Sequence, residues 1–252
     1  MLDKITKILS YCDSEDARIR PTELYNEGWL LRLVLDWFEN ENPFSHQHEL
    51  AFDTDARWNS EILLPSQFLA RYQKDKLAES HTNADGVIGH FEIGNKGKGD
   101  INLNDNACQF KVLEAKIFSK LSSGVSNASY YNQAARNVAC MAEVISRKGI
   151  GSGNLDDIGF YVLAPESQIE KKSSFGRYIS KKHIEDTVLR RVEEYGNKNK
   201  VEWYNNWFLP LLESMDIKCI SWEKVINFIN KKDDSAGNEL EEFYCKCLKY
   251  NR

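Results

Sequence analysis

The strongest pattern along the chain is a stretch of apolar residues at helical spacing over residues 22–40. Apolar side chains three and four positions apart share one face of a helix and pack that face against a core. Pro21 and Thr22, at the beginning of the stretch, are typical of a helix start. The pattern therefore predicts a largely buried helix, whose apolar stripe is Leu24, Leu31, Val34, Leu35 and Phe38.

Glu27 interrupts the apolar stripe of this helix. Helical spacing places its carboxylate beside Leu24 and Leu31. Burying an unpaired carboxylate costs free energy, so the side chain should face a metal ion, a bound water or a cation. A side chain that extends from the edge of the stripe into solvent is the structural alternative.

The pattern changes over residues 85–119. Short runs of β-favouring residues at 87–93, 100–103 and 110–118 are separated by the turn-forming segments GNKGKG and NDNA. This arrangement predicts an antiparallel meander of three strands. Upstream, over residues 41–85, we expect only a short strand or turn that ends at Pro65 and a helix around 66–74.

A helical period returns over residues 126–148, and an apolar run at 158–166 follows it. A continuous apolar run of this length is typical of a central strand covered on both faces. The order of helix, three strands, helix and strand predicts that the last strand lies beside the third after a right-handed crossover. Residues 167–252 are predicted to be helical, with helices near 181–195, 222–231 and 238–249.

The composition agrees with one domain spanning residues 1–252. Hydrophobic residues make up 42% of the chain and charged residues 28%, which are ordinary globular values. Apolar runs stay short of the roughly 18–20 residues that a membrane helix needs, and the beginning of the chain lacks a signal-peptide pattern. The six cysteines are scattered without a CxxC pair, as expected for free thiols in a reducing compartment. These features predict a cytoplasmic protein that does not contact a membrane.

The charge is unevenly distributed. A net charge of −5 argues against a general nucleic-acid coat protein, but residues 171–200 hold nine basic residues against four acidic ones. A basic strip on an acidic protein can hold a phosphate backbone, and Lys181 and Lys182 are the candidates for that contact. The structural alternative is the solvated face of a helix.

Glu114 and Lys116, in the segment VLEAKIF, are the central candidates for chemistry. Side chains two positions apart in a strand point to the same face, so the carboxylate and the ammonium lie together. A carboxylate holds a hard divalent cation, and an ammonium orients a water and screens developing charge during phosphodiester hydrolysis. Asp100, in GKGDINL on the preceding predicted strand, supplies a second acid.

The register of the predicted hairpin tests this arrangement. A two-residue turn at Asp105 and Asn106 would place Asp100 opposite Lys111, on the wrong face of the sheet. The connection must therefore have an odd number of residues or contain a bulge.

GKGDINL followed by VLEAKIF resembles the PD-(D/E)xK motif of the restriction-endonuclease-like nuclease superfamily, and the element order over residues 22–166 resembles its core. The resemblance implies an α/β fold with a central mixed sheet of four to five strands flanked by helices, followed by a helical extension at 167–252. It also implies that Asp100 and Glu114 bind Mg²⁺, for which Mn²⁺ can substitute. The carbonyl of Ala115 would be a third ligand, and Lys116 the catalytic lysine.

The resemblance implies further roles around this centre. Glu27 matches a glutamate that many members place on their first helix, close to the metal and its waters. Gln133 resembles a polar residue that approaches the metal-bound water, and Tyr130 or Arg136 beside it would contact phosphate. The chain departs from the family pattern at Gly99, where the motif name has a proline. It also lacks a QxxxY signature, which leaves endonuclease and exonuclease action open.

The predicted function is thus metal-dependent hydrolysis of phosphodiester bonds in nucleic acid, with DNA as the expected substrate. The alternative is an inactive nucleic-acid-binding or scaffold subunit of the same fold. The sequence leaves open a homodimer or a partner protein. Lys96 and Lys98, in the turn GNKGKG, are expected to touch phosphate. A transition-metal hydrolase built on His81, Asp85 and His90 is a further alternative, whereas GxSxG and phosphate-loop motifs are absent from the sequence.

Overall fold

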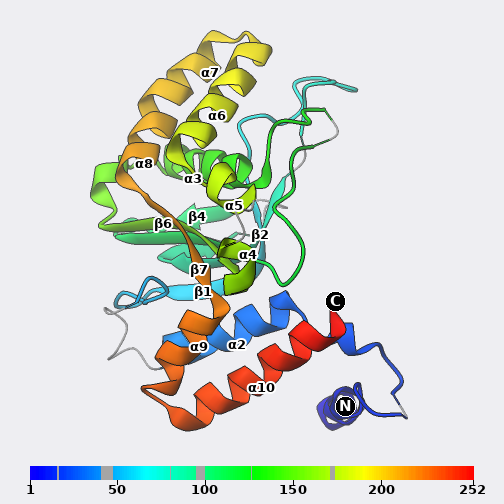
Figure 1. The fold of residues 1–252 in the computed structure, drawn as a ribbon. Helices are drawn as coiled ribbons and strands as arrows, with labels where there is room; N and C mark the ends of the chain where they lie inside the picture. The colour runs from blue at the N-terminus through cyan, green and yellow to red at the C-terminus, as the bar shows by residue number, and fades with distance from the viewer. Residues whose placement is uncertain (16, 41–47, 80, 95–99, 126, 171–173) are drawn as a thin grey trace.

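The computed structural model describes residues 1–15, 17–40, 48–79, 81–94, 100–125, 127–170 and 174–252. At the centre of this described part lies a mixed sheet of five strands in the order β1, β2, β5, β6, β7 (Figure 1). Strands β1, β2 and β5 are antiparallel neighbours, and β5, β6 and β7 are parallel. The predicted α/β class with a mixed central sheet is confirmed. The five strands are β1 (Arg57–Leu64), β2 (Thr82–Gly89), β5 (Gln109–Ala115), β6 (Asp157–Ala164) and β7 (Asp216–Ser221).

Helices cover both faces of the sheet (Figure 1). One face is covered by α3 (Gln133–Lys148) and by a group formed from α6 (Lys181–Tyr195), α7 (Lys198–Trp203), η4 (Tyr204–Phe208) and α8 (Leu209–Ser214). The other face is covered by α2 (Glu27–Asn40), α9 (Trp222–Asn230) and α10 (Asp234–Tyr250). The shorter helices are α1 (Leu2–Ser10), η1 (Pro21–Glu23), η3 (Ser152–Asn154), α4 (Glu166–Glu170) and α5 (Ser174–Tyr178).

The alternation of side chains along the strands divides the apolar core in two. Val112 of β5 belongs to the cluster beneath α3, whereas its neighbours Leu113 and Ala115 belong to the cluster that packs against α2, α9 and α10. Seven of the eight residues of β6 are buried, which confirms the predicted central strand. Strand β6 lies parallel beside β5, as the element order predicted.

The predicted three-stranded meander over residues 87–118 is wrong. Strand β5 pairs directly with β2, and β3 (Phe91–Ile93) pairs with β4 (Ile101–Leu103) in a separate two-stranded sheet. The chain leaves the main sheet at Gly89, whose φ of 149° suits only glycine. A Cβ atom there would lie 2.3 Å from the carbonyl oxygen of Gln109. The run predicted as one strand is therefore split between two sheets.

Other element boundaries also depart from prediction. Residues 66–74 form turns instead of a helix, and β7 is a strand within a region predicted to be helical. The helix predicted over 126–148 begins at Gln133, because the side chain of Asn132 accepts a hydrogen bond from the backbone N–H of Ala135 and caps it. Within the described ranges, no helix is long and apolar enough to cross a bilayer.

Candidate functional site

Glu114 lies near the end of β5, fully buried on the face that α3 covers. Its carboxylate accepts hydrogen bonds from the Nε2 of Gln133 and, at 3.1 Å, from the Nδ2 of Asn137. Residues four positions apart share one side of a helix, so both amides reach the carboxylate from the first turns of α3. Gln133, predicted to approach a metal-bound water or the phosphate, contacts the carboxylate of Glu114. Asn137 is an additional contact that the sequence did not single out.

Lys116 follows β5 directly, and its ammonium group is bound to the carboxylate of Glu114. Its backbone is held on both sides. The N–H donates to the carbonyl of Leu163 at 2.8 Å, and the carbonyl accepts from the indole N–H of Trp222, also at 2.8 Å. These bonds fix the direction from which the lysine side chain enters the site.

Asp85 on β2 is the second acid of this site. Gly86 lies opposite Leu113, so extending the antiparallel register by one residue places Asp85 opposite Glu114. Its carboxylate accepts a hydrogen bond from the N–H of Ala115 at 2.8 Å and lies 3.7 Å from the ammonium of Lys116. Two carboxylates and one ammonium therefore converge from adjacent strands.

Asp100, the second acid predicted from sequence, lies elsewhere. Strand β4 pairs with β3 and not with β5, so the prediction that Asp100 sits on the neighbouring strand is wrong. Its backbone carbonyl accepts from Gly94, and its carboxylate accepts from Asn102 at 3.2 Å within the β3–β4 hairpin. The parity test on the connection does not apply, because β4 belongs to the separate two-stranded sheet and not to the sheet that contains β5.

Asp85 appeared in the sequence only as a candidate ligand beside His81 and His90. Local sequence carries no signal for this role, because Asp85 stands in the turn-like segment TNADG just before the run predicted at 87–93. A direct antiparallel pairing places an acid at 85 opposite the acid at 114 without any condition on the turn. The Gly-rich turn and the short run at 100–103 instead favoured pairing of 100–103 with the run at 110–118, which is nearer along the chain.

Glu27 is the first residue of α2 and is half-buried. Burial lowers the pKa of Lys116, but the neighbouring charges of Glu114, Asp85 and Glu27 outweigh it and raise the pKa overall. The negative charge of Glu27 therefore stabilises the same ammonium, that of Lys116, as do the charges of Asp85 and Glu114. The apolar stripe predicted beside it is observed, since Leu31, Val34 and their neighbours are buried.

Three acidic side chains, Glu27, Asp85 and Glu114, surround the one lysine of the site. Burial raises the pKa of Glu114, the charge of Asp85 raises it further, and the ammonium of Lys116 acts in the opposite direction. Two carboxylates on neighbouring strands of one sheet repel each other when both are ionised, and a bound cation would relieve that repulsion. The electrostatics of the site thus suit a further positive charge.

The kind of cation that the site could bind depends on the ligand atoms that its residues offer. Across the described residues, no group of three or more His, Cys, Asp or Glu side chains is placed to hold a metal ion. Magnesium needs less from the protein, because it is usually held by one or two carboxylates together with water and phosphate oxygens. Asp85, Glu114 and the carbonyl of Ala115 are all oxygen donors, and this set fits Mg²⁺ or Mn²⁺.

The residues predicted to contact nucleic acid do not join Glu114 directly. Arg136 donates to the hydroxyl of Thr82 at 3.3 Å and lies 3.9 Å from the carboxylate of Glu79. The hydroxyl of Tyr130 donates to Glu194 on α6, and the guanidinium of Arg190 lies 3.6 Å from the centre of its ring. Tyr130 is thus held against α6.

The two lysines predicted to contact phosphate in the basic strip each have a partner within the protein. Lys182 lies 2.9 Å from Asp186, and the ammonium of Lys181 donates to the carbonyl of Glu213. A pair four residues apart, such as Lys182 and Asp186, is typical of a solvated helix face. This favours the structural interpretation for these two lysines. The predicted phosphate contacts Lys96 and Lys98 lie outside the described residues.

The alternative centre at His81, Asp85 and His90 is not supported by the contacts of His90. Its Nε2 donates to the carbonyl of Thr54 at 2.8 Å, and its Nδ1 accepts from the N–H of Gln109 at 3.2 Å. Both ring nitrogens are therefore used by the backbone. The nearby thiol of Cys108 donates to Asp53, which together with burial raises its pKa to about 11, so it is not a thiolate nucleophile at neutral pH.

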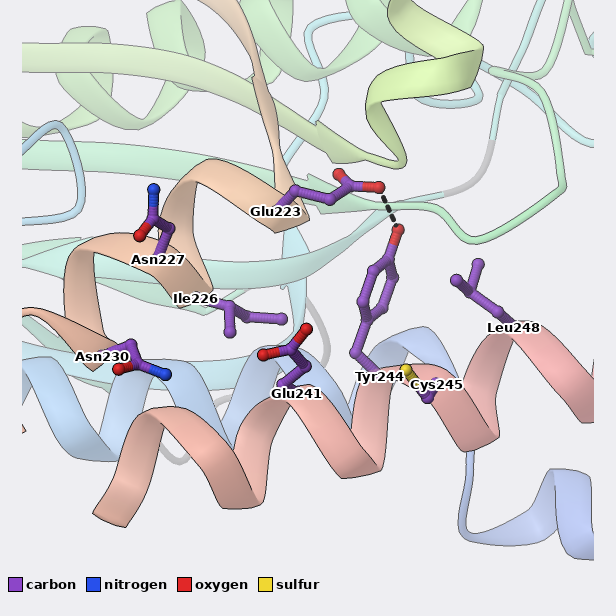
Figure 2. A pocket seen from close by; sticks show the side chains of 8 residues that line it. All are labelled: Glu223, Ile226, Asn227, Asn230, Glu241, Tyr244, Cys245 and Leu248. Atoms are coloured by element: carbon purple, nitrogen blue, oxygen red, sulfur yellow. Dashed lines mark hydrogen bonds between the residues drawn. The ribbon is translucent and has the colours of Figure 1, made fainter. Parts of the chain in front are cut away.

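A separate pocket of about 400 Å³ lies between α9 and α10. Figure 2 shows the hydroxyl of Tyr244 directed at the carboxylate of Glu223 across this pocket, at 2.7 Å. Glu223 also accepts from the backbone N–H of Glu166 at 2.9 Å. Its carboxylate is thus used in joining α9 to α10 and α4. The residues lining the pocket are Glu223, Ile226, Asn227, Asn230, Glu241, Tyr244, Cys245 and Leu248.

The strand pairing therefore assembles one group of side chains suited to phosphodiester chemistry. Its members are Glu27, Asp85, Glu114, Lys116, Gln133 and Asn137. Comparison of the chain with protein-family models, with curated proteins and with solved structures found no match in any of the three.

Proposed function

We propose that this protein is a metal-dependent phosphodiesterase with a restriction-endonuclease-like core, and that it hydrolyses DNA. One observation carries the proposal: Asp85 and Glu114 lie opposite each other on adjacent strands, with Lys116 within 3.7 Å of the former and bound to the latter. Acids and a lysine in this arrangement suit the charge changes of phosphodiester hydrolysis.

The order of elements supports the proposed core. Helix α2 is followed by β1, β2, β5, α3 and β6, with β3 and β4 as an insertion between β2 and β5. This is the helix, three strands, helix and strand that the sequence resemblance implies. It puts one acid on the second strand, the ExK segment at the end of the third, and Gln133 at the start of the following helix.

Each side chain has a role in the proposed mechanism. Asp85, Glu114 and the carbonyl of Ala115 would hold Mg²⁺, which when bound polarises a phosphate oxygen and lowers the pKa of its water. Lys116 would orient the attacking water and offset the charge that develops on the phosphate. Gln133 and Asn137 hold the carboxylate of Glu114 in place through their hydrogen bonds. Glu27, on α2, favours the charged form of Lys116.

The test is cleavage of plasmid, linear duplex, single-stranded DNA and RNA with Mg²⁺ or Mn²⁺. We expect Asp85→Asn and Lys116→Ala each to lower the rate at least about 100-fold, since each removes a group that acts on the transition state. Asp100→Asn is the matched control and should leave the rate unchanged, because Asp100 lies in the β3–β4 hairpin. Equal losses in Asp85→Asn and Asp100→Asn would contradict the proposal.

Metal binding gives a second readout on the same variants. A ligand at 100 times its Kd stabilises a folded protein by about 2.7 kcal/mol. Mg²⁺ should therefore raise the Tm of the wild type and of Asp100→Asn, but not that of Asp85→Asn.

The second candidate function is a nucleic-acid-binding or scaffold subunit with the same fold. The observation in its favour is that Lys116 already occupies the carboxylate of Glu114. Binding of DNA without cleavage of any substrate on the panel, and without a shift in Tm by Mg²⁺, would select this candidate.

A further inference from the structure

Helix α1 presents an apolar face that the described residues of its own chain leave uncovered. In the described part of the molecule none of its side chains is buried. Leu2, Ile5 and Ile8 are 78%, 48% and 45% exposed, and their spacing places them on one side of the helix. A helix of nine residues is marginal in water without packing, so α1 needs a surface to lie on.

The segment directly after α1 is held against the C-terminal half of α10. Cys12 is fully buried, and the carboxylate of Asp13 lies 3.2 Å from the ammonium of Lys246 and accepts from the hydroxyl of Tyr25 at 3.4 Å. Figure 1 shows α1 standing apart from the rest of the molecule beside the second half of α10. From this anchor the helix projects into solvent.

A groove of about 330 Å³ between α2 and α10 has the complementary character. Leu33 within it is 41% exposed, and Trp29, one turn earlier on α2, is 40% exposed. Acidic residues from both helices, Asp36 and Glu239, line it as well. The full lining is Leu33, Asp36, Trp37, Asn40, Ala236, Glu239, Leu240 and Phe243.

The groove and α1 match in length and in charge. The apolar positions of α1 from Leu2 to Ile8 span about 9 Å, and the lining of the groove on α2, from Leu33 to Asn40, spans about 10.5 Å. Lys4 adjoins the apolar side of α1, and Lys7 lies one turn further along. These lysines would face Asp36 and Glu239 when the apolar sides of α1 and the groove meet.

We propose that α1 of one copy of this chain docks into the α2–α10 groove of a second copy, and that the exchange is reciprocal and closes a homodimer. The groove lies along the first half of α10, whereas the anchor of α1 lies on the second half. A two-fold exchange uses both grooves and both helices, so the assembly stops at two copies.

The test is the molar mass of the full chain in solution over a range of concentrations, by sedimentation or light scattering. We expect a concentration-dependent mass that approaches twice the 29.1 kDa of one chain. Ile5→Asp with Ile8→Asp, and separately Leu33→Asp, should weaken association at least about tenfold. Leu189→Asp is the matched control, because Leu189 is a similarly exposed leucine on α6 (36%) and should not alter the mass.

A charge exchange gives a sharper criterion. Lys4→Glu and Glu239→Lys should each weaken the dimer, because both of its contacts then pair like charges. An equimolar mixture of the two single variants should restore association, because both contacts of the mixed dimer pair opposite charges. A chain that stays monomeric at every concentration overturns the proposal, whether α1 then packs on its own groove or binds anionic vesicles. A dimer that survives Ile5→Asp with Ile8→Asp overturns it equally.

Discussion

The two acids of the site show how much a single residue depends on its neighbours across the sheet. Asp85 and Asp100 are both acids at the edge of a β-favouring run, and local sequence does not distinguish them. Pairing of β2 with β5 places Asp85 opposite Glu114, while the β3–β4 hairpin carries Asp100 away. A carboxylate becomes a candidate metal ligand here through strand register alone.

His48 shows the same dependence through burial. Its ring packs against Phe38 and Phe228, with ring centres 4.9 and 4.8 Å away, and its Nδ1 accepts from the N–H of Leu50 at 3.0 Å. Burial lowers the pKa of His48 from 6.5 to about 4, and the charge of Glu49 opposes this only in part. The folded protein thus keeps this imidazole neutral under mildly acidic conditions.

The predicted consequence is a loss of stability in mild acid. The unfolded chain takes up a proton near pH 6.5, whereas the folded chain takes it up only near pH 4, so stability falls as the pH drops between these values. Between pH 7 and pH 5 we expect a loss of about 2 kcal/mol from this residue. Chemical unfolding at both pH values measures it. His48→Gln should show a drop smaller by that amount, and an identical drop in the variant would refute the assignment.

At the scale of elements, the decisive feature is the point where β2 ends. Gly89 has a left-handed φ of 149°, and its Cα lies close to the backbone of β5. This geometry directs the chain out of the main sheet into the β3–β4 hairpin. The β2–β5 pairing that aligns Asp85 with Glu114 ends at this residue.

We therefore expect Gly89→Ala to lower the free energy of unfolding by at least about 2 kcal/mol, because it combines backbone strain with a steric clash against Gln109. Gly151→Ala is the matched control. Apart from its two chain neighbours, no described residue has an atom within 4 Å of the Cβ position at Gly151, so its substitution should be nearly neutral. Denaturant titration of the two variants makes the comparison, and equal stability would contradict the role given to Gly89.

At the scale of the whole molecule, residues 167–252 belong to the same sheet and core as the predicted nuclease core at 22–166. Strand β7 pairs with β6 from Gly159 to Ala164. Trp222, Val225 and Ile229 of α9 pack in the same apolar cluster as Leu31 and Leu113. Trp222 also binds the backbone of Lys116, which connects this region to the candidate site.

A chain ending at residue 166 should accordingly fail to unfold cooperatively, because it exposes one edge of β6 and the apolar face beneath α9 and α10. Removing residues 1–11 is the contrasting truncation. Since α1 buries none of its described side chains, that shortened chain should keep a cooperative transition. Thermal unfolding followed by circular dichroism distinguishes the two. Cooperative unfolding of the chain ending at 166 would show that the C-terminal region is dispensable for folding.

By itself the sequence determined those features that depend on local periodicity. The apolar stripe of α2, the buried run of β6 and the shared face of Glu114 and Lys116 follow from spacings of three to four or two residues, and all are observed. The α/β class and the mixed sheet follow from the order of such segments.

Only the tertiary structure decided which strand lies beside β5, and with it the identity of the second acid. Pairing between strands is a long-range choice, and it is governed by the close approach at Gly89 and by the packing of the intervening hairpin. Neither of these two factors produces a periodic pattern of residues in the sequence. Strand β7 is another example, since six residues within a helical region gain their strand conformation from the exposed edge of β6.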